Sequence, residues 1–481
     1  MPKRNLILIL AIVVAAIIAV FEARNASIFT GRGNWQPSTA RSGHEEEFQP
    51  VNETYRLIKD RYLYPLEGQE LRQGAVRGMV SSLDEYSTYV APGRTGAFEQ
   101  HLLGRERGLG LRVDVVDGQV TVLGPMAGSP ALRAGIMAGD IIVAIDGKAA
   151  AGLGPEQMTA LLDGPVGASV KLTLFRAPGP QTTLTLTREE FPIESVTGLY
   201  RHSSGTWVCV IDPASGIAYV RIREFVRDTT EQFQQLLRQL DRLQGLVLDL
   251  RGNPGGLLES SVGVSDLFLR EGRIVSVVRR DGPPEEHMAT PTGTYPDIPV
   301  VVLIDEGTAS AAEIVAGALR LRGRAVLLGT RTCGKGCVQS MFKLPDDLGR
   351  INLTTSEFCL DSDEPISRRP GSPRWGVDPH EQIIILPSRQ EKLARLRAAA
   401  EVLPLGRPTT LPLISPAGEG PPGMAEAMLR LDSPLERAVE LLKKPREIEA
   451  ILKAAEAERA ARKARTAASD PRDKEGLQAR P

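Results

Sequence analysis

The stretch GLVLDLRGNPGG (245–256) joins a continuous apolar run to a glycine-rich turn. Apolar residues at consecutive rather than alternate positions are typical of a strand buried on both faces of a parallel sheet. Similar runs occur at GIAYVRI (216–222), VVVLID (300–305) and RAVLLG (324–329). Stretches with helical periodicity lie between them, namely EQFQQLLRQLDRL (231–243), SVGVSDLFL (261–269) and SAAEIVAGALRLR (310–322). This alternation predicts an α/β region with a largely parallel sheet and crossover helices.

The rest of the chain divides into segments of different character. Short strand-like pieces surround one helical stretch, PEQMTALLD (155–163), and predict a compact β-rich module. Before this module, LDEYSTYV (83–90) is expected to end a helix or form a turn. We expect a membrane anchor or signal segment at 1–24, a linker at 25–50, a helical segment at 51–103, the β-rich module at 104–188, the α/β core at 189–390, and a helical, partly disordered tail at 391–481.

Composition narrows the functional classes. The 481 residues are 42% hydrophobic and 24% charged, with a formal net charge of -1. These values are ordinary for folded protein, and the even charge balance gives no global basic field for nucleic acid. The four cysteines form no CxxC pair and the five histidines are scattered. The sequence therefore predicts neither a disulfide framework nor a metal site, and no cofactor is expected.

The amino terminus predicts a membrane segment. The run Leu6–Phe21 is unbroken and apolar, and Lys3 and Arg4 precede it. As a helix it would span ~24 Å at 1.5 Å per residue, slightly less than a ~30 Å hydrocarbon core. Because no A-x-A cleavage pattern lies nearby, we favour a single-pass anchor over a cleaved signal peptide. Either interpretation places the body outside the cytoplasm, in a periplasm or cell envelope.

Two polar motifs follow strands of the α/β core, and each has an ordinary explanation. Ser310-Ala-Ala-Glu313 fits a helix capping box. The string GTRTCGK (329–335) has the spacing of a phosphate-binding loop. However, Gly336 stands where a Ser or Thr should bind magnesium, and the following residues do not read as a helix. These departures argue against nucleotide binding.

Together the two motifs predict Ser–Lys chemistry. A hydroxyl at a helix start after a buried strand lies at a sheet edge, and Ser310 is such a residue. No histidine belongs to a motif near Ser310 that would mark it as the base. A lysine can act as the base if desolvation lowers the pKa of its amine. Lys335 lies between two glycines just past an apolar strand. Gln339 returns to the same side of an extended segment and can hold the amine without adding charge.

These residues resemble the C-terminal processing (tail-specific) serine peptidases, in the stretches TASAAEIVAGALR (308–320) and RAVLLGTRTCGKGCVQ (324–339). The resemblance implies that Ser310 is the nucleophile, that Lys335 is the base and that Gln339 orients the lysine. It also implies a crotonase-like α/β protease core, with an inserted PDZ domain and flanking helical segments.

The resemblance extends to the groups that would stabilise the transition state. LVLDLRGNPGGLL (246–258) matches the oxyanion segment of the family. It implies one donor amide at Gly256, or at its neighbour Gly255, and a second at Ala311. Two amides aimed at the developing oxyanion are usually the largest single term in such catalysis.

The β-rich module resembles the PDZ domain that this family inserts before its core. The resemblance rests on GLGLRV (108–113) and SPALRAGIMAGDIIVAIDGK (129–148). It implies that the loop residues Leu109, Gly110 and Leu111 bind the terminal carboxylate of a peptide, which adds as a strand to the sheet edge. The late stretch DSPLERAVELLKK (432–444) resembles the usual C-terminal helix of the family.

Departures from the family pattern surround the lysine. Thr308 and Ala312 replace serines that are common beside the nucleophile, and the stretch 359–381 is also unusual. Cys333 and Cys337 flank the lysine, and in an extended segment their Cα atoms would lie ~13 Å apart, beyond the ~7 Å limit for a disulfide. Pairing with Cys359 or Cys209, free thiols and a redox switch all stay open, with inert small residues as the default.

We therefore expect a membrane-anchored serine endopeptidase that captures unstructured C-terminal tails of proteins and cleaves them, as a monomer or a homo-oligomer. One alternative is a catalytically inactive PDZ scaffold, although the intact Ser310, Lys335 and Gln339 argue against it. A second is an acyl-CoA-type enzyme with the same core fold, which the PDZ-like module disfavours.

Overall fold

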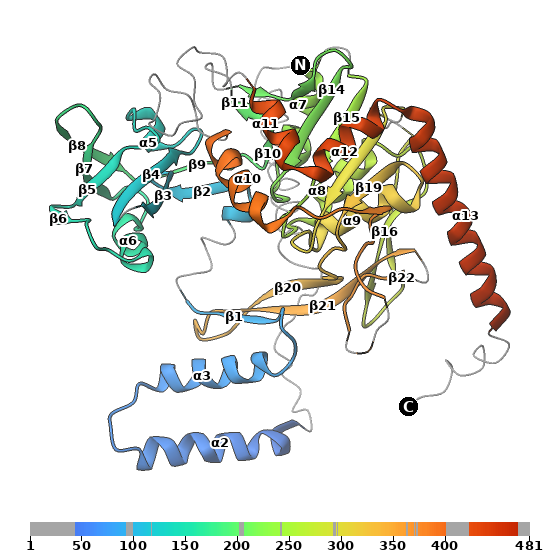
Figure 1. Ribbon diagram of the computed structural model, residues 1–481. Helices are drawn as coiled ribbons and strands as arrows, with labels where there is room; N and C mark the ends of the chain where they lie inside the picture. Colours follow the sequence, from blue (N-terminus) through green and yellow to red (C-terminus); the bar gives the residue numbers. More distant parts are fainter. Residues whose placement is uncertain are drawn as a thin grey trace, which may run out of the picture. The chain divides into compact units, whose positions relative to one another are not determined.

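The computed structural model describes residues 44–92, 100–116, 118–201, 206–240, 243–291, 295, 297–361, 364–369, 371, 374–400 and 423–469 (Figure 1). They form two compact units. One contains the described residues before position 99 together with Arg279–Pro283 and Cys337–Glu357, and the other contains the remainder. The expected anchor at Leu6–Phe21 lies outside the described residues. Among those that are described, no helix is long and apolar enough to cross a membrane.

The core of the larger unit is the parallel sheet that the apolar runs predicted. Its strands follow the order β10-β14-β15-β18-β19-β23, and β13 pairs with β14. The pairs β14–β15, β15–β18, β18–β19 and β19–β23 are parallel. The bounds are β10 Val196–Thr197, β13 Val210–Asp212, β14 Ile217–Ile222, β15 Gly245–Asp249, β18 Val300–Ile304, β19 Ala325–Gly329 and β23 Glu381–Gln382. Every residue of β15, β18 and β19 is buried.

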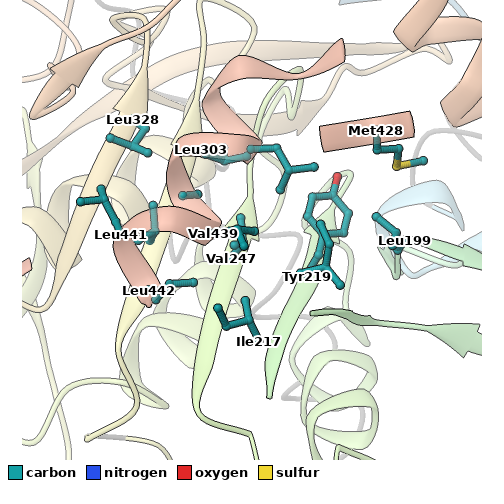
Figure 2. Close-up of a cluster of buried hydrophobic side chains, with 14 of the residues drawn as sticks. Leu199, Ile217, Tyr219, Val247, Leu303, Leu328, Met428, Val439, Leu441 and Leu442 are labelled. Atoms are coloured by element: carbon teal, nitrogen blue, oxygen red, sulfur yellow. The ribbon is translucent and has the colours of Figure 1, made fainter. Parts of the chain in front are cut away.

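Helices α7 (Thr229–Arg238), α8 (Leu258–Asp266) and α9 (Ala311–Leu321) make the expected crossovers between these strands. The carboxyl-terminal part adds α10 (Pro387–Ala400), α11 (Met424–Leu431), α12 (Ser433–Leu442) and α13 (Pro445–Ser469). Helix α12 packs on β15, β18 and β19, where Val439 and Leu441 meet Val247 and Leu303 in one apolar cluster (Figure 2). The carboxyl-terminal helices are therefore part of the core rather than an appendage to it.

The β-rich module has a five-strand path, β3-β4-β5-β7-β8, with β6 paired to β5. The bounds are β3 Leu111–Val116, β4 Gln119–Pro125, β5 Ile141–Ile145, β6 Lys148–Ala149, β7 Ser169–Phe175 and β8 Gln181–Thr187, with helices α5 Pro130–Arg133 and α6 Pro155–Leu162. Its own apolar core includes Val122, Ile136, Ile145 and Leu172. Strand β3 lies at one edge of the sheet.

Smaller pairings complete the larger unit. Strand β2 (Arg105–Gly108) pairs with β9 (Glu189–Pro192), and β11 (Tyr200–Arg201) pairs with β12 (Trp207–Val208). Strand β16 (Arg273–Arg279) pairs with β17 (Glu285–Met288), and β22 (Glu364–Pro365) pairs with the end of β21.

The smaller unit corrects two expectations. Helix α2 (His44–Arg61) begins inside the expected linker, and α3 (Gly68–Ser81) follows it. After α3 ends, residues 82–87 follow a turn and bend as expected, but Thr88–Val90 form a strand, β1. Strand β1 pairs with β21 (Arg350–Asp361), which also pairs with β20 (Cys337–Lys343). Cross-strand hydrogen bonding explains the strand, because three residues cannot reveal a partner more than 250 positions away.

Candidate active site

Ser310 stands at a strained junction between the loop after β18 and helix α9. Its backbone has φ 54° and ψ -119°, an unusual conformation for a residue with a side chain. Such strain persists only where neighbouring contacts hold it. The amide of Ala309 donates to the carbonyl of Asn253 at 2.9 Å, and the amide of Ser310 donates to Glu313 Oε2 at 2.9 Å. The side chain of Ser310 is only partly buried.

Glu313 is a fully buried carboxylate. It joins Ser310 to the loop between β19 and β20 that carries Lys335, here called the lysine loop. Besides the Ser310 amide, its Oε2 accepts the amide of Lys335 at 2.8 Å. Its Oε1 accepts the amide of Gly334 at 2.8 Å and the hydroxyl of Thr332 at 2.5 Å. One carboxylate oxygen therefore touches the backbones of the proposed nucleophile and the proposed base. The backbone nitrogens of Ser310 and Lys335 must lie closer together than the sum of those two distances.

The protonation of Glu313 reflects two opposed effects. Burial raises the pKa of this carboxyl, whereas its four hydrogen-bond donors act to lower it, and the net direction is upward. All four partners point a hydrogen at the carboxylate, so the geometry suits the ionised form at neutral pH. In this setting the carboxylate fixes the backbone amides of Ser310 and Lys335.

The lysine loop is packed from its other side by the unusual segment after β22. Trp375 lies so close to Gly334 that a Cβ there would come within 2.6 Å of its ring. The guanidinium groups of Arg331 and Arg368 lie 4.4 Å and 5.1 Å from the centre of that ring. The Thr332 hydroxyl also accepts the Val377 amide at 2.7 Å. The loop therefore has a defined course on both sides of Gly334.

Gln339 lies on β20, in the smaller unit, so the segment that carries it is extended, as the sequence analysis assumed. Its Nε2 lies 2.9 Å from Cys337 Sγ and 3.4 Å from Thr354 Oγ1. Its role toward Lys335 stays a prediction.

The hydrogen bonds of the oxyanion segment show which of Gly255 and Gly256 is the better candidate donor. The amide of Gly255 already donates to Asn253 Oδ1 at 2.8 Å. The Gly255 carbonyl accepts from the Phe225 amide, and the Leu257 amide donates to the Phe225 carbonyl. These two bonds form a parallel bridge between Phe225 and Gly256. In such a bridge the central residue points its own amide to the opposite side. Gly256 is therefore the better candidate donor.

Close contact brings this segment to the nucleophile. A Cβ at Gly255 would come within 2.7 Å of Ser310 Cβ and 3.0 Å of the Ala311 amide nitrogen. Glycine is required here because the backbones approach so closely, and because φ is +100°. The structure thus brings together the predicted serine, the glycine segment and Ala311.

Neither a disulfide nor a metal-binding cluster occurs among the residues that the structure describes. None of Cys209, Cys333, Cys337 and Cys359 forms a disulfide, so none of the pairings left open by the sequence is present. Burial raises the pKa of the Cys209 thiol to about 12, as expected for an inert residue. Within the part of the chain that the structure describes, no group of three or more His, Cys, Asp or Glu side chains is arranged to hold a metal ion.

Comparison with known proteins decides the family. Residues 216–383 match peptidase family S41, residues 121–176 match a PDZ domain, and residues 15–92 match the N-terminal domain of the activating protease CtpB. The carboxy-terminal processing protease CtpA of Bacillus subtilis is 32% identical over 76% of this chain and 75% of its own length. The carboxyl-terminal-processing protease of Synechocystis is 34% identical over 65% of this chain and 72% of its own length.

The chain belongs to peptidase family S41. It is a serine peptidase of the carboxy-terminal processing group, with a PDZ domain. The solved photosystem II D1 C-terminal processing protease is 29% identical, with a TM-score of 0.42 over 74% of this chain and 93% of that chain. The finer description of the core of this S41 peptidase as crotonase-like stays a prediction.

Several residues that organise the site of this S41 peptidase were missed by sequence reasoning. Glu313 appeared only as half of a capping box, and Asn253 only as part of a turn. Asn253 is fully buried, and its Nδ2 donates to the Ile222 carbonyl at 2.9 Å. A signal for Glu313 was available, since it is the one charge in the apolar stretch AAEIVAGAL (311–319).

Proposed function

We propose that this peptidase cleaves peptide bonds near unstructured C-terminal tails of proteins, with Ser310 as nucleophile and Lys335 as base. The observation that carries the proposal is the shared carboxylate oxygen of Glu313, on which the backbone amides of Ser310 and Lys335 meet. Positioning of this kind supplies much of the rate in an intramolecular proton transfer.

The reaction would proceed through an acyl-enzyme. Ser310 Oγ attacks the scissile carbonyl carbon and its proton passes to the neutral amine of Lys335. The carbonyl oxygen becomes an oxyanion, which the amides of Gly256 and Ala311 stabilise. As the tetrahedral intermediate collapses, the peptide C–N bond breaks and Lys335 gives its proton to the leaving amine. Water then attacks the ester, with Lys335 again as base, and Ser310 is regenerated.

The positioning of Lys335 would be completed by Gln339. An amide oxygen can accept a hydrogen bond from the amine without adding a negative charge, which would favour the ammonium form. Replacement of Gln339 by Ala should therefore reduce turnover less than replacement of Lys335.

Tail capture would occur at the edge of the PDZ sheet. Strand β3 pairs only with β4 among the described strands, so its other edge can accept an added strand. The proposed binding loop, Leu109 to Leu111, runs into β3 at Leu111, and the carbonyls of Gly110 and Leu109 accept from the amides of Met126 and Ala131. Gly110 has φ +69°, and a Cβ there would lie 2.0 Å from Ser129 Cβ. We propose that amides of this loop bind the terminal carboxylate of the tail.

The apolar run Leu6–Phe21 supports a further part of the proposal, an anchor in the cytoplasmic membrane with the catalytic body on the extracytoplasmic side. Accessibility of the body to a protease added to intact cells or spheroplasts tests this topology. Protection of the body until the cells are lysed would contradict it.

The test of the function is cleavage of an unfolded reporter protein that carries an apolar C-terminal tail. The full-length peptidase in detergent is compared with Ser310→Ala and Lys335→Ala, and the reporter with a tail-amidated version. Both variants should lose cleavage while still binding the tail, and amidation should weaken cleavage by the unmutated peptidase. Undiminished cleavage by either variant would contradict Ser–Lys catalysis. Tail binding without any cleavage by the unmutated chain would favour the scaffold alternative.

A further inference from the structure

A buried ionic cluster connects the oxyanion segment to the carboxyl-terminal helices, which the sequence left without a role. Arg251 directly precedes the glycine turn 252–256, and only 4% of it is exposed. Its Nε donates to Asp249 Oδ1 at 2.9 Å and its Nη2 to Asp249 Oδ2 at 2.7 Å. The same guanidinium donates to Asp432, from Nη1 to Oδ1 at 2.7 Å and from Nη2 to Oδ2 at 2.8 Å. Arg251 is thus held by two carboxylates at once.

Asp432 comes from the start of α12. It is fully buried, and its Oδ1 also accepts the amide of Leu435 at 3.2 Å, which caps that helix. Arg397 of α10 adds a second cation, donating to Asp432 Oδ2 at 2.8 Å and reaching Asp249 Oδ2 at 3.3 Å. The Tyr219 hydroxyl donates to Asp249 Oδ2 at 2.7 Å. The cluster therefore pairs two carboxylates with two guanidinium groups.

The charge balance makes each member necessary. Burial acts to raise the pKa of Asp249, but the guanidinium groups of Arg251, Arg397 and Arg221 together outweigh it and hold this pKa far below its usual range. Removing one member of a buried ionic cluster leaves an uncompensated charge, which is strongly unfavourable. Without the Asp432 carboxylate, the Arg251 guanidinium would have to move or recruit water, and the Arg251 backbone leads directly into the glycine turn 252–256 of the oxyanion segment.

Hydrogen bonds connect the turn after Arg251 to the loop that carries Ser310. The Arg251 carbonyl accepts from Arg221 Nη2 at 3.2 Å, and the Gly252 amide donates to Asp305 Oδ1 at 2.8 Å. Asn253 then connects the turn to Ala309, next to the nucleophile. A shift of the donor amides by about 1 Å is enough to cost on the order of 100-fold in rate.

We propose that Asp432 is a positioning residue of the active site: through Arg251, the helix α12 sets the oxyanion segment. This inference rests on the proposed role of Gly256 and Ala311 as oxyanion donors. It assigns a catalytic purpose to the carboxyl-terminal helices, beyond their packing on the sheet.

The test uses Asp432→Asn in the full-length protein, because the amide keeps the helix cap and removes the charge. The matched control is Leu441→Ala, which weakens the packing of α12 without touching the ionic cluster. Three quantities are measured besides Tm: kcat and KM for the tailed reporter, and the affinity for an acetylated tripeptide boronic acid. Boron forms a tetrahedral adduct with the serine oxygen, so the affinity reports the oxyanion site.

Asp432→Asn should lower kcat about tenfold, change KM less than twofold, and weaken boronic acid binding about as much as kcat. Leu441→Ala should lower Tm at least as much, while its kcat and its boronic acid affinity stay within twofold of the unmutated values. Equal effects of the two variants on boronic acid binding would show that Asp432 is only structural. Failure of the unmutated chain to bind the boronic acid, or undiminished binding by Ser310→Ala, would instead overturn the proposed function.

If Asp432→Asn does not fold, Arg397→Gln takes its place, because Arg397 lies at the partly exposed rim of the cluster. We expect about a threefold loss of both kcat and boronic acid affinity for this variant. Unchanged kcat and affinity in Arg397→Gln would contradict the proposal in the same way.

Discussion

Two buried carboxylate sites hold this active site, and they are satisfied in opposite ways. Glu313 accepts from three backbone amides and one hydroxyl. Asp249 and Asp432 are paired mainly with the guanidinium groups of Arg251 and Arg397. The first site holds the backbones of Ser310 and Lys335, the proposed nucleophile and the proposed base. The second holds a side chain, that of Arg251, which directly precedes the turn with the proposed oxyanion donor Gly256.

The largest effect is expected at Glu313. Glu313→Ala would leave three buried or part-buried amides and the Thr332 hydroxyl without their acceptor. Each buried group left without an acceptor costs about 1–3 kcal/mol. We expect kcat to fall by about 100-fold or more, because the backbones of Ser310 and Lys335 would separate. Steady-state kinetics and denaturant unfolding measure the two effects.

The matched control is Glu306→Ala, which removes a carboxylate from an exposed position in the loop between β18 and α9. It should change kcat less than twofold. Glu313→Gln keeps one acceptor oxygen and should lie between the two. Full activity of Glu313→Ala would refute the role of the carboxylate in joining the serine to the lysine loop.

A smaller loss of activity is expected at Asp249. Asp249→Asn breaks the ionic cluster and should lower the free energy of unfolding by about 3 kcal/mol and kcat by about tenfold. The exposed pair Arg270–Asp297 provides the control, and Asp297→Asn should cost less than about 1 kcal/mol. Chemical denaturation of both variants measures the difference.

The pH dependence of this loss follows from the direction of the pKa shift. The pKa of Asp249 is held far below its usual range, so its stabilisation is present above the unfolded pKa of about 3.9 and is lost only as pH falls through the much lower folded pKa. The deficit of Asp249→Asn should therefore be constant between pH 5 and pH 8, to within about 0.5 kcal/mol. A deficit that disappears within that range would contradict the assigned ionisation.

The two carboxylate sites were not equally predictable from the sequence. Continuous apolar runs were sufficient for the sheet, because burial on both faces leaves a direct signature in composition. Ser310 and Lys335 followed from short motifs. The partnership of Arg251 with Asp432 spans 181 positions, and nothing local distinguishes either residue from a solvated charge. Strand β1 was missed for the same reason, because its pairing with β21 is a tertiary contact.

The smallest effect concerns a third titratable group, His380, which has no carboxylate hydrogen-bond partner among the described contacts. Its Nδ1 accepts the Leu327 amide at 2.9 Å, so an added proton would break that bond. Burial, with a smaller contribution from Arg320, lowers the pKa of His380 from 6.5 to about 4. Between these values the unfolded chain binds more protons, so stability should fall as pH is lowered from about 6.5 to about 4.

The control for this pH effect is His380→Asn, whose side-chain oxygen can replace Nδ1 as acceptor but does not titrate. Its stability should vary less over the same pH range, as followed by Tm. Identical pH profiles for His380→Asn and the unmutated chain would show that His380 does not contribute.

The most direct measurement is labelling of the full-length protein with a fluorophosphonate probe, read by intact and peptide mass spectrometry. Ser310 activated by Lys335 predicts a single adduct on Ser310, absent from Ser310→Ala and formed at least about 100-fold more slowly by Lys335→Ala. Labelling of another residue, or labelling of Lys335→Ala at the unmutated rate, would contradict the assignment of Ser310 as nucleophile and Lys335 as its base.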